Sequence, residues 1–155
     1  MADWSEFEQQ APDLAAAVRA RFEAHRHHVL ATLRTDGSPR VSGTEVEFAG
    51  DEMRLGSMFG ARKALDLQRD PRFAVHANPG EHTMVGGDAK LSGRAAELTG
   101  AELDEACAAL PPELLPCHYF TLDLDQVVLT EVLHDPDRMR IRSWRPGQGV
   151  REFWR

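Results

Sequence analysis

The stretch Leu55–Leu65, with the sequence LGSMFGARKAL, contains the change of pattern that decides the fold. It begins as a strand that ends on the hydroxyl of Ser57, bends at Gly60, and continues with Arg62 and Lys63 at the start of a helix. Helix amide groups and two cations suit an anion, to which a serine hydroxyl can donate a hydrogen bond. The alternative is that both cations are solvated charges on the helix face.

The residues before this stretch predict a helix followed by antiparallel strands. Leu14, Val18 and Phe22 lie four residues apart, which predicts one apolar helix face within residues 12–26. Alternating and β-rich segments then predict strands over residues 29–34, 40–48 and 52–57. The turns between these strands are too short for a crossover helix, so a meander is expected.

The residues after it predict two further helices and several more strands. One helix is expected over residues 61–69, and a second over residues 99–110 with Thr99 capping it through Glu102. Strands are expected over residues 72–77, 88–98, 119–124, 127–133 and 139–144, the third and fourth of these forming one bent strand or two. Residues 81–87 are expected to form an exposed loop, and an aromatic and basic tail follows a turn at 146–149. Six to eight mostly antiparallel strands with a few short helices predict an all-β to α+β fold, a barrel in a single domain over residues 1–155.

The composition excludes some classes of function. The chain has 18 Lys and Arg against 25 Asp and Glu, and a net charge of −7 disfavours binding to nucleic acid or to an anionic membrane. No apolar run approaches the roughly 20 residues of a membrane span, and no signal peptide is evident, so a cytoplasmic protein is expected. Cys107 and Cys117 are expected to be reduced, buried and inert thiols. No metal-ligand cluster, Ser-His-Asp spacing or dinucleotide fingerprint appears, so no metal site is expected.

Three segments in succession resemble the pyridoxamine 5'-phosphate oxidase-like family of FMN-binding split β-barrels. They are Arg40-Val41, Ala61-Arg62-Lys63 with Asp70-Pro71 downstream, and the stretch from Gly87 to Arg94. The resemblance implies a split barrel of six to eight strands and a homodimer with the cofactor at the subunit interface. The cofactor would be FMN or the 8-hydroxy-5-deazaflavin coenzyme (F-420).

The resemblance also implies cofactor contacts at Arg40, Val41, Ser42, Thr44, Ser57, Arg62, Lys63, Asp88 and Lys90. Arg62 and Lys63 would hold the phosphate with help from Ser57, and Arg40 to Ser42 would follow the flavin ring and its ribityl chain. Thr44 shares a strand face with them. Asp88 stands where the family has a glutamine, and an ionised carboxylate cannot donate to a ring carbonyl. Lys90 faces the same way as Asp88, so it either pairs with that carboxylate or meets the cofactor.

The function expected from this resemblance is that of a flavin- or deazaflavin-dependent oxidoreductase that transfers hydride to a small-molecule substrate. The tail over residues 144–155 does not match the Arg-rich C-terminal motif of pyridoxamine-phosphate oxidases proper, which disfavours that activity. The overall pattern is closer to the actinobacterial branch that uses the deazaflavin coenzyme. No catalytic residue is assigned. The alternative is a non-catalytic cofactor-binding or carrier protein of the same fold.

Overall fold

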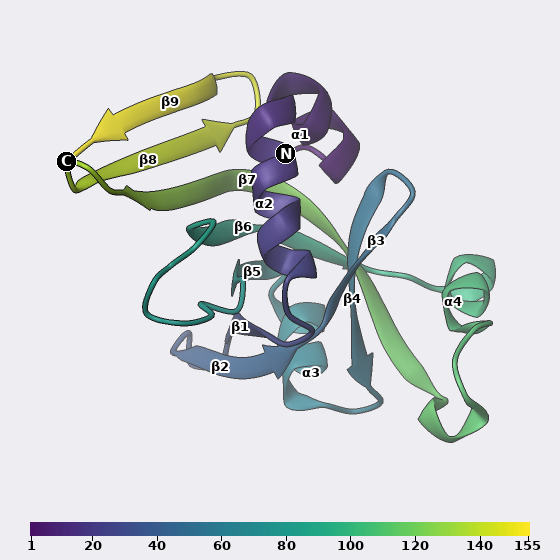
Figure 1. Cartoon of the computed structure of the whole chain (residues 1–155). Helices are drawn as coiled ribbons and strands as arrows, with labels where there is room; N and C mark the ends of the chain where they lie inside the picture. The colour runs from purple at the N-terminus through teal and green to yellow at the C-terminus, as the bar shows by residue number, and fades with distance from the viewer.

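The computed structural model describes residues 1–155 and has a nine-stranded sheet at its centre, with four α-helices around it (Figure 1). The strands are β1 (His28–Leu33), β2 (Pro39–Thr44), β3 (Val46–Ala49), β4 (Glu52–Met58), β5 (Arg72–His76), β6 (Asp88–Glu97), β7 (Cys117–Leu133), β8 (Arg138–Arg145) and β9 (Gly149–Trp154). The helices are α1 (Trp4–Gln10), α2 (Pro12–Glu23), α3 (Arg62–Arg69) and α4 (Gly100–Cys107), with a 3-10 turn, η1, at Pro112–Leu114. The expected class, mostly antiparallel strands with a few short helices, is confirmed.

The strand order is β2-β1-β5-β6-β7-β4-β3, and β8 and β9 continue from β7. The expected meander is wrong at one point, because β2 and β3 are consecutive in the chain but lie at opposite edges of this path. The chain bends at Glu45, after which β3 pairs with β4, and β4 pairs with the first part of β7. The 17-residue β7 pairs with β8 through its last part, so one long strand joins both halves of the barrel.

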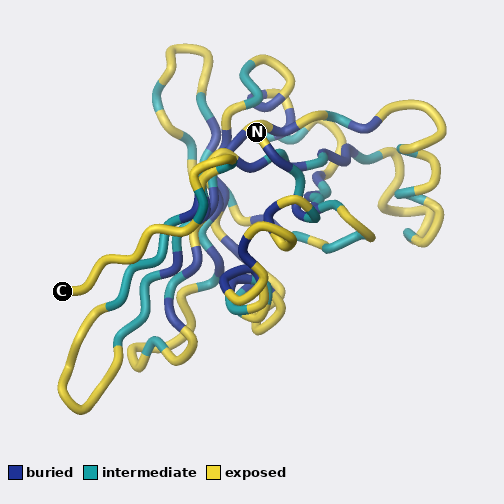
Figure 2. The backbone as a smooth tube through the Cα atoms, turned by 90° about the horizontal axis from the view of Figure 1, so that it is seen from above, coloured by how far each residue is buried: buried dark blue, intermediate teal, exposed yellow.

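The core lies between the sheet and the first two helices. It is a cluster of 25 buried hydrophobic residues, to which α1 contributes Trp4 and Phe7. The ring of Phe7 lies 4.7 Å from that of Trp144 on β8. Figure 2 shows that burial is concentrated in the central strands, while the hairpin ends and loops are exposed. The predicted helix over residues 12–26 is observed as Pro12–Glu23, and α1, which a capping box at Asp3 and Glu6 starts, was not predicted.

Several local expectations differ from the structure. The strand expected over residues 40–48 is interrupted at Glu45, whereas residues 117–133 form the single long strand that was one of the two alternatives expected there. Thr99 precedes α4 but makes no side-chain capping hydrogen bond, so the capping prediction there is wrong. The basic and aromatic tail forms β9 by pairing with β8. None of the helices is long and apolar enough to cross a membrane.

The two cysteines are also placed differently from the expectation. Neither Cys107 nor Cys117 is fully buried, and both are free thiols. Their sulfur atoms lie 3.0 Å apart, because the end of α4 meets the start of β7. The prediction that these thiols are buried is therefore wrong.

Candidate functional site

A cavity of about 360 Å³ lies where β2, β4 and α3 meet the segment between α4 and β7. Thr44, Ser57 and Lys63, which the sequence predicts as cofactor contacts, all line it. Its far wall is formed by Leu110 and Leu114 from the segment after α4, together with Cys117 and Tyr119 from β7. The fold therefore brings three of the nine predicted contact residues to one cavity.

Lys63 is the only Lys or Arg residue that lines this cavity. Its ammonium group donates a hydrogen bond of 2.9 Å to the carbonyl of Gly43, and it takes part in no ion pair. Burial lowers the pKa of Lys63 from its ordinary value, although the field of Glu45 acts in the opposite direction. A partly desolvated cation without a carboxylate partner is poorly compensated, and an anion in the cavity would compensate it.

Two buried hydroxyl groups lie on the same cavity wall. Thr44 is 3% exposed and Ser57 is 8% exposed. Each hydroxyl donates only to a neighbouring carbonyl, that of Thr44 to Glu45 at 3.2 Å and that of Ser57 to Met58 at 3.3 Å. These local bonds are long for hydroxyl donors, so both groups can turn toward a ligand oxygen.

The loop between β4 and α3 is held by a histidine from β7. The backbone N–H of Gly60 donates to Nε2 of His118 at 3.1 Å, and Nδ1 of His118 lies 2.5 Å from the carboxylate of Glu97. Because Nε2 accepts, the ring proton of the neutral histidine is on Nδ1, where it faces the carboxylate. The ring of Phe59 stacks on His118 with 5.1 Å between centroids. Sequence reasoning missed this Glu97–His118 pair, since the partners are 21 residues apart and join two different strands.

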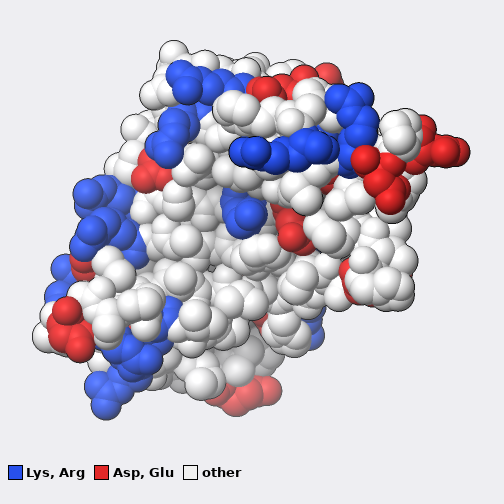
Figure 3. Space-filling model, turned by 90° about the vertical axis from the view of Figure 1, so that its left-hand side faces the viewer, with Lys and Arg blue, Asp and Glu red and all other residues white.

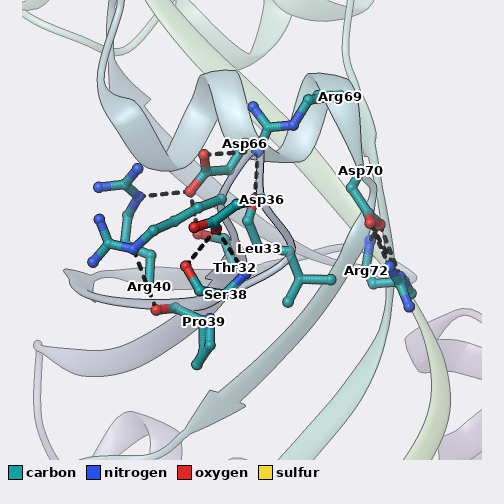
Figure 4. Close-up of polar contacts among 11 residues, drawn as sticks. Thr32, Leu33, Asp36, Ser38, Pro39, Arg40, Asp66, Arg69, Asp70 and Arg72 are labelled. Carbon is teal, nitrogen blue, oxygen red and sulfur yellow. Dashed lines mark hydrogen bonds and ion pairs between the residues drawn. The ribbon is translucent and has the colours of Figure 1, made fainter.

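Arg40 has a structural partner in Asp66 of α3 (Figure 4). One carboxylate oxygen of Asp66 accepts hydrogen bonds from Thr32 at 2.8 Å and from Arg40 at 2.7 Å, and the other accepts from Arg69 at 3.1 Å. Burial alone would raise the pKa of Asp66, but these hydrogen bonds lower it below its ordinary value. Arg40 thus fastens β2 to α3 through its Nε atom, and its contact with a cofactor stays a prediction.

The other predicted contacts do not line the cavity. Val41 is 69% exposed, Arg62 is exposed without an ion pair, and Ser42 is half-buried. Asp88 and Lys90 lie on β6, which β1 and β5 separate from β2. Lys90 forms no ion pair with Asp88, whose carboxylate instead lies 3.9 Å from Nε2 of His76. Within one chain, Asp88 and Lys90 are therefore separate from the residues that line the cavity.

A second hollow, of about 310 Å³, lies on the outward face of β1, β5, β6 and β7. Small or apolar side chains dominate it, among them Val29, Ala31, Ala74 and Val128, and Lys90 lies at the same hollow. Val29 is 41% exposed, although its strand β1 is paired on both sides, with β2 and β5. The hollow is thus lined mainly by small and apolar side chains.

Charged side chains do not merge into one broad basic surface on the side of the molecule in Figure 3. The Lys and Arg side chains lie there in separate groups, mostly toward the margin, with uncharged surface between them. An extended polyanion needs a continuous basic track. The side of the molecule in Figure 3 therefore offers no continuous basic track to an extended polyanion.

The long strand β7, which both halves of the sheet share, defines the chain as a split β-barrel, and Lys63 is a cation that lines its cavity. The family model for pyridoxamine 5'-phosphate oxidase matches residues 14–129. The chain belongs to this pyridoxamine 5'-phosphate oxidase-like family of FMN-binding split barrels.

Solved structures show the same fold. A pyridoxamine 5'-phosphate oxidase-related, FMN binding protein of Nostoc punctiforme PCC 73102 is 14% identical with a TM-score of 0.64, over 94% of this chain and 95% of that one. PhzG from Burkholderia lata 383, solved with tetrahydrophenazine-1-carboxylic acid, is 15% identical with a TM-score of 0.66, over 96% and 91%. A heme binding protein from Mycobacterium smegmatis is 22% identical with a TM-score of 0.54, over 89% and 57%. None of the curated proteins matches the sequence.

Proposed function

We propose that this chain holds the phosphate of FMN, or of the 8-hydroxy-5-deazaflavin coenzyme, at the cavity beside Lys63, and that it is an oxidoreductase acting on a small molecule. The observation that carries the proposal is the ammonium of Lys63, which is partly buried, has a lowered pKa and lacks an ion-pair partner. A phosphate group would supply the missing negative charge through charge-assisted hydrogen bonds.

The residues around the cavity fit a phosphate group. The hydroxyls of Thr44 and Ser57 add two donors beside the ammonium. Two carboxylates, Glu45 and Glu47, also line the cavity, but Glu45 lies 2.9 Å from Arg26, which offsets its charge. The bound cofactor would supply the hydride chemistry, while these residues bind and orient it.

Arg62 is the second cation of the proposed phosphate site. It is exposed at the first position of α3, next to Lys63, and it takes part in no ion pair. An exposed guanidinium can reach a phosphate at the mouth of the cavity without first breaking another ion pair. We therefore expect Arg62 to add less to affinity than the partly buried Lys63, because solvent screens exposed charges.

A homodimer is part of the proposal. If the outward face of β1, β5, β6 and β7 pairs with a second copy, apolar side chains such as Val29 and Ala74 are covered. A partner would also supply the β6 residues Asp88 and Lys90 that one chain cannot bring to its own phosphate site. Ala74→Arg, in the middle of this face, should then give a monomer in analytical ultracentrifugation. A wild-type monomer at the same concentration would refute the dimer.

Cofactor titration tests the central part of the proposal. Purified protein is titrated separately with FMN, the deazaflavin coenzyme and haemin, and ligand fluorescence or absorbance is followed. Lys63→Met should weaken binding of the phosphate-bearing ligand at least about tenfold, since a charge-assisted hydrogen bond contributes about 1.5–3 kcal/mol. Arg94→Met removes an exposed cation outside the cavity and should leave binding unchanged. Binding of haemin alone, or equal affinities of wild type and Lys63→Met, would reject the proposal.

Turnover distinguishes the oxidoreductase from a carrier of the same cofactor. Reduced cofactor bound to the protein is mixed with quinones, tetrapyrroles and enones, and its oxidation is compared with the rate without protein. An enzyme accelerates oxidation by at least one class of acceptor. Tight binding without any acceleration would support the carrier.

A further inference from the structure

Cys107 and Cys117 are the two ends of a segment that forms one wall of the cavity at Lys63. Cys107 is the last residue of α4 and Cys117 the first residue of β7, and their sulfur atoms lie 3.0 Å apart. Between them, Leu110 and Leu114 line the cavity. A bond between the two sulfur atoms would therefore join both ends of this wall.

The helix before this wall is weakly anchored. None of the residues of α4 is buried, and the side chain of Thr99 does not cap the helix. Leu114, in the 3-10 turn η1, is 52% exposed although it lines the cavity. A segment with few buried apolar contacts opens more readily than the sheet below it.

We propose that Cys107 and Cys117 are an oxidation site, at which a hydroperoxide converts the two thiols into an intramolecular disulfide that fastens the α4–η1 wall over the cavity. The sulfur atoms would approach each other by about 1 Å to reach the disulfide bond length of about 2.05 Å. Both residues are partly exposed, so a small peroxide can reach them.

The chemistry balances with the peroxide as the oxidant. The thiolate of one cysteine attacks a peroxide oxygen, the O–O bond breaks, and the leaving oxygen takes a proton, which leaves a sulfenic acid. The second thiol then attacks that sulfur, the S–O bond breaks, and water leaves with the second proton. Two thiols and one hydrogen peroxide thus give one disulfide and two waters, and the two electrons pass to the peroxide.

The two sulfurs are close enough for one to resolve the oxidised form of the other. Burial, together with the neighbouring Cys107 thiol, raises the pKa of Cys117 to about 11, so Cys117 is protonated at neutral pH. Since the thiolate is the nucleophile, the cysteine that ionises first attacks the peroxide, and the other cysteine, whose sulfur lies 3.0 Å away, resolves the sulfenic acid. A nine-residue stretch, 108–116, is then closed into a loop, and Leu110 and Leu114 are held within it.

Peroxide treatment of the reduced full chain tests the inference without any cofactor. Free thiols are counted before and after treatment, the intact mass is measured, and peptides are mapped without reduction. The expected result is loss of both thiols, a mass lower by two hydrogen atoms, and a peptide that links Cys107 to Cys117. The matched variants Cys107→Ser and Cys117→Ser should not show this mass loss, and at least one of them should accumulate a sulfenic acid that a dimedone probe traps.

Hydrogen exchange tests the effect on the wall. Amide exchange over residues 100–116 should slow in the oxidised protein, while exchange in β5 and β6 stays the same. Persistent free thiols under conditions that oxidise glutathione, sulfinic acid at either position, or disulfides only between chains would each overturn the inference. A disulfide that leaves exchange over residues 100–116 unchanged would overturn the claim that it fastens the wall.

Discussion

The substitution Asp66→Asn should lower the free energy of unfolding by about 2–3 kcal/mol. It removes the negative charge of a buried carboxylate that accepts hydrogen bonds from Thr32 on β1, Arg40 on β2 and Arg69 on α3. The Asp66 side chain is 4% exposed, and that of Arg40 is 22% exposed. Asparagine keeps one oxygen, which can still accept from Thr32 and Arg40, but its amide nitrogen cannot accept from Arg69. The bond from Arg40 then ends on a neutral amide oxygen instead of a carboxylate, so part of the contribution of a hydrogen bond between charged groups, about 1.5–3 kcal/mol, is lost. The Arg69 side chain is 39% exposed, so that bond adds at most about 1 kcal/mol.

Urea unfolding measures this difference directly. Trp4 and Trp144 are 1% and 0% exposed, so their fluorescence reports loss of the core. Asp66→Asn should lower the midpoint without changing the slope. Asp70→Asn is the matched control, since Asp70 also pairs with an arginine, Arg72, but lies at the surface. Asp70→Asn should leave the urea midpoint nearly unchanged.

The pH dependence of stability gives a second test of the Asp66 contacts. The pKa of Asp66 is lowered in the folded chain, so its contribution is fully present above the ordinary pKa of about 3.9 and is lost as the pH falls through the lower, folded value. The stability difference between wild type and Asp66→Asn should therefore shrink below about pH 4. Equal midpoints for Asp66→Asn and Asp70→Asn at neutral pH would refute the reasoning, as would a difference that does not change with acid.

Two further substitutions test the loop and the sheet. His118→Phe removes the acceptor for the Gly60 amide, so hydrogen exchange at that amide should accelerate. His118→Asn retains an acceptor and should preserve part of the protection. Equal exchange in both variants would contradict the conclusion that His118 holds the loop at Gly60. Gly93→Ala would place a Cβ atom 1.8 Å from the carbonyl of Asp123, so it should destabilise the chain severely, while Gly43→Ala meets nothing within 4 Å and should leave the urea midpoint nearly unchanged. Similar midpoints for Gly93→Ala and Gly43→Ala would contradict the observed strand packing.

The strand pattern was predictable where alternation and turn residues agree. The Asp36-Gly37 turn and the period of two after His28 predict the β1–β2 hairpin, and its register is Leu33 opposite Pro39. The tail was harder to assign, because β9 exists only through its pairing with β8 and five of its six residues are exposed. The position of the β3–β4 hairpin depends on the pairing of β4 with β7, a strand that begins only at Cys117, and no local pattern specifies such a pairing.

The candidate site was predictable in part. Lys63 and Ser57 were found because a strand end, a glycine bend and a helix start are adjacent in sequence. Asp66 was missed, because a single acid in a short helix of mixed charge is typical of a helix face exposed to solvent. Only the fold shows that its side chain is buried against Thr32 and Arg40. The nearness of Cys107 and Cys117 was equally hidden, because it depends on the path of the chain through η1.

A comparison of FMN with riboflavin tests the central claim most directly, since the two ligands differ only in the phosphate. Each affinity is measured for wild type and for Lys63→Met. We expect wild type to prefer FMN at least about tenfold, and Lys63→Met to lose most of that preference while its riboflavin affinity stays the same. Equal preference for FMN in both proteins, or no preference in wild type, would contradict a phosphate site at Lys63.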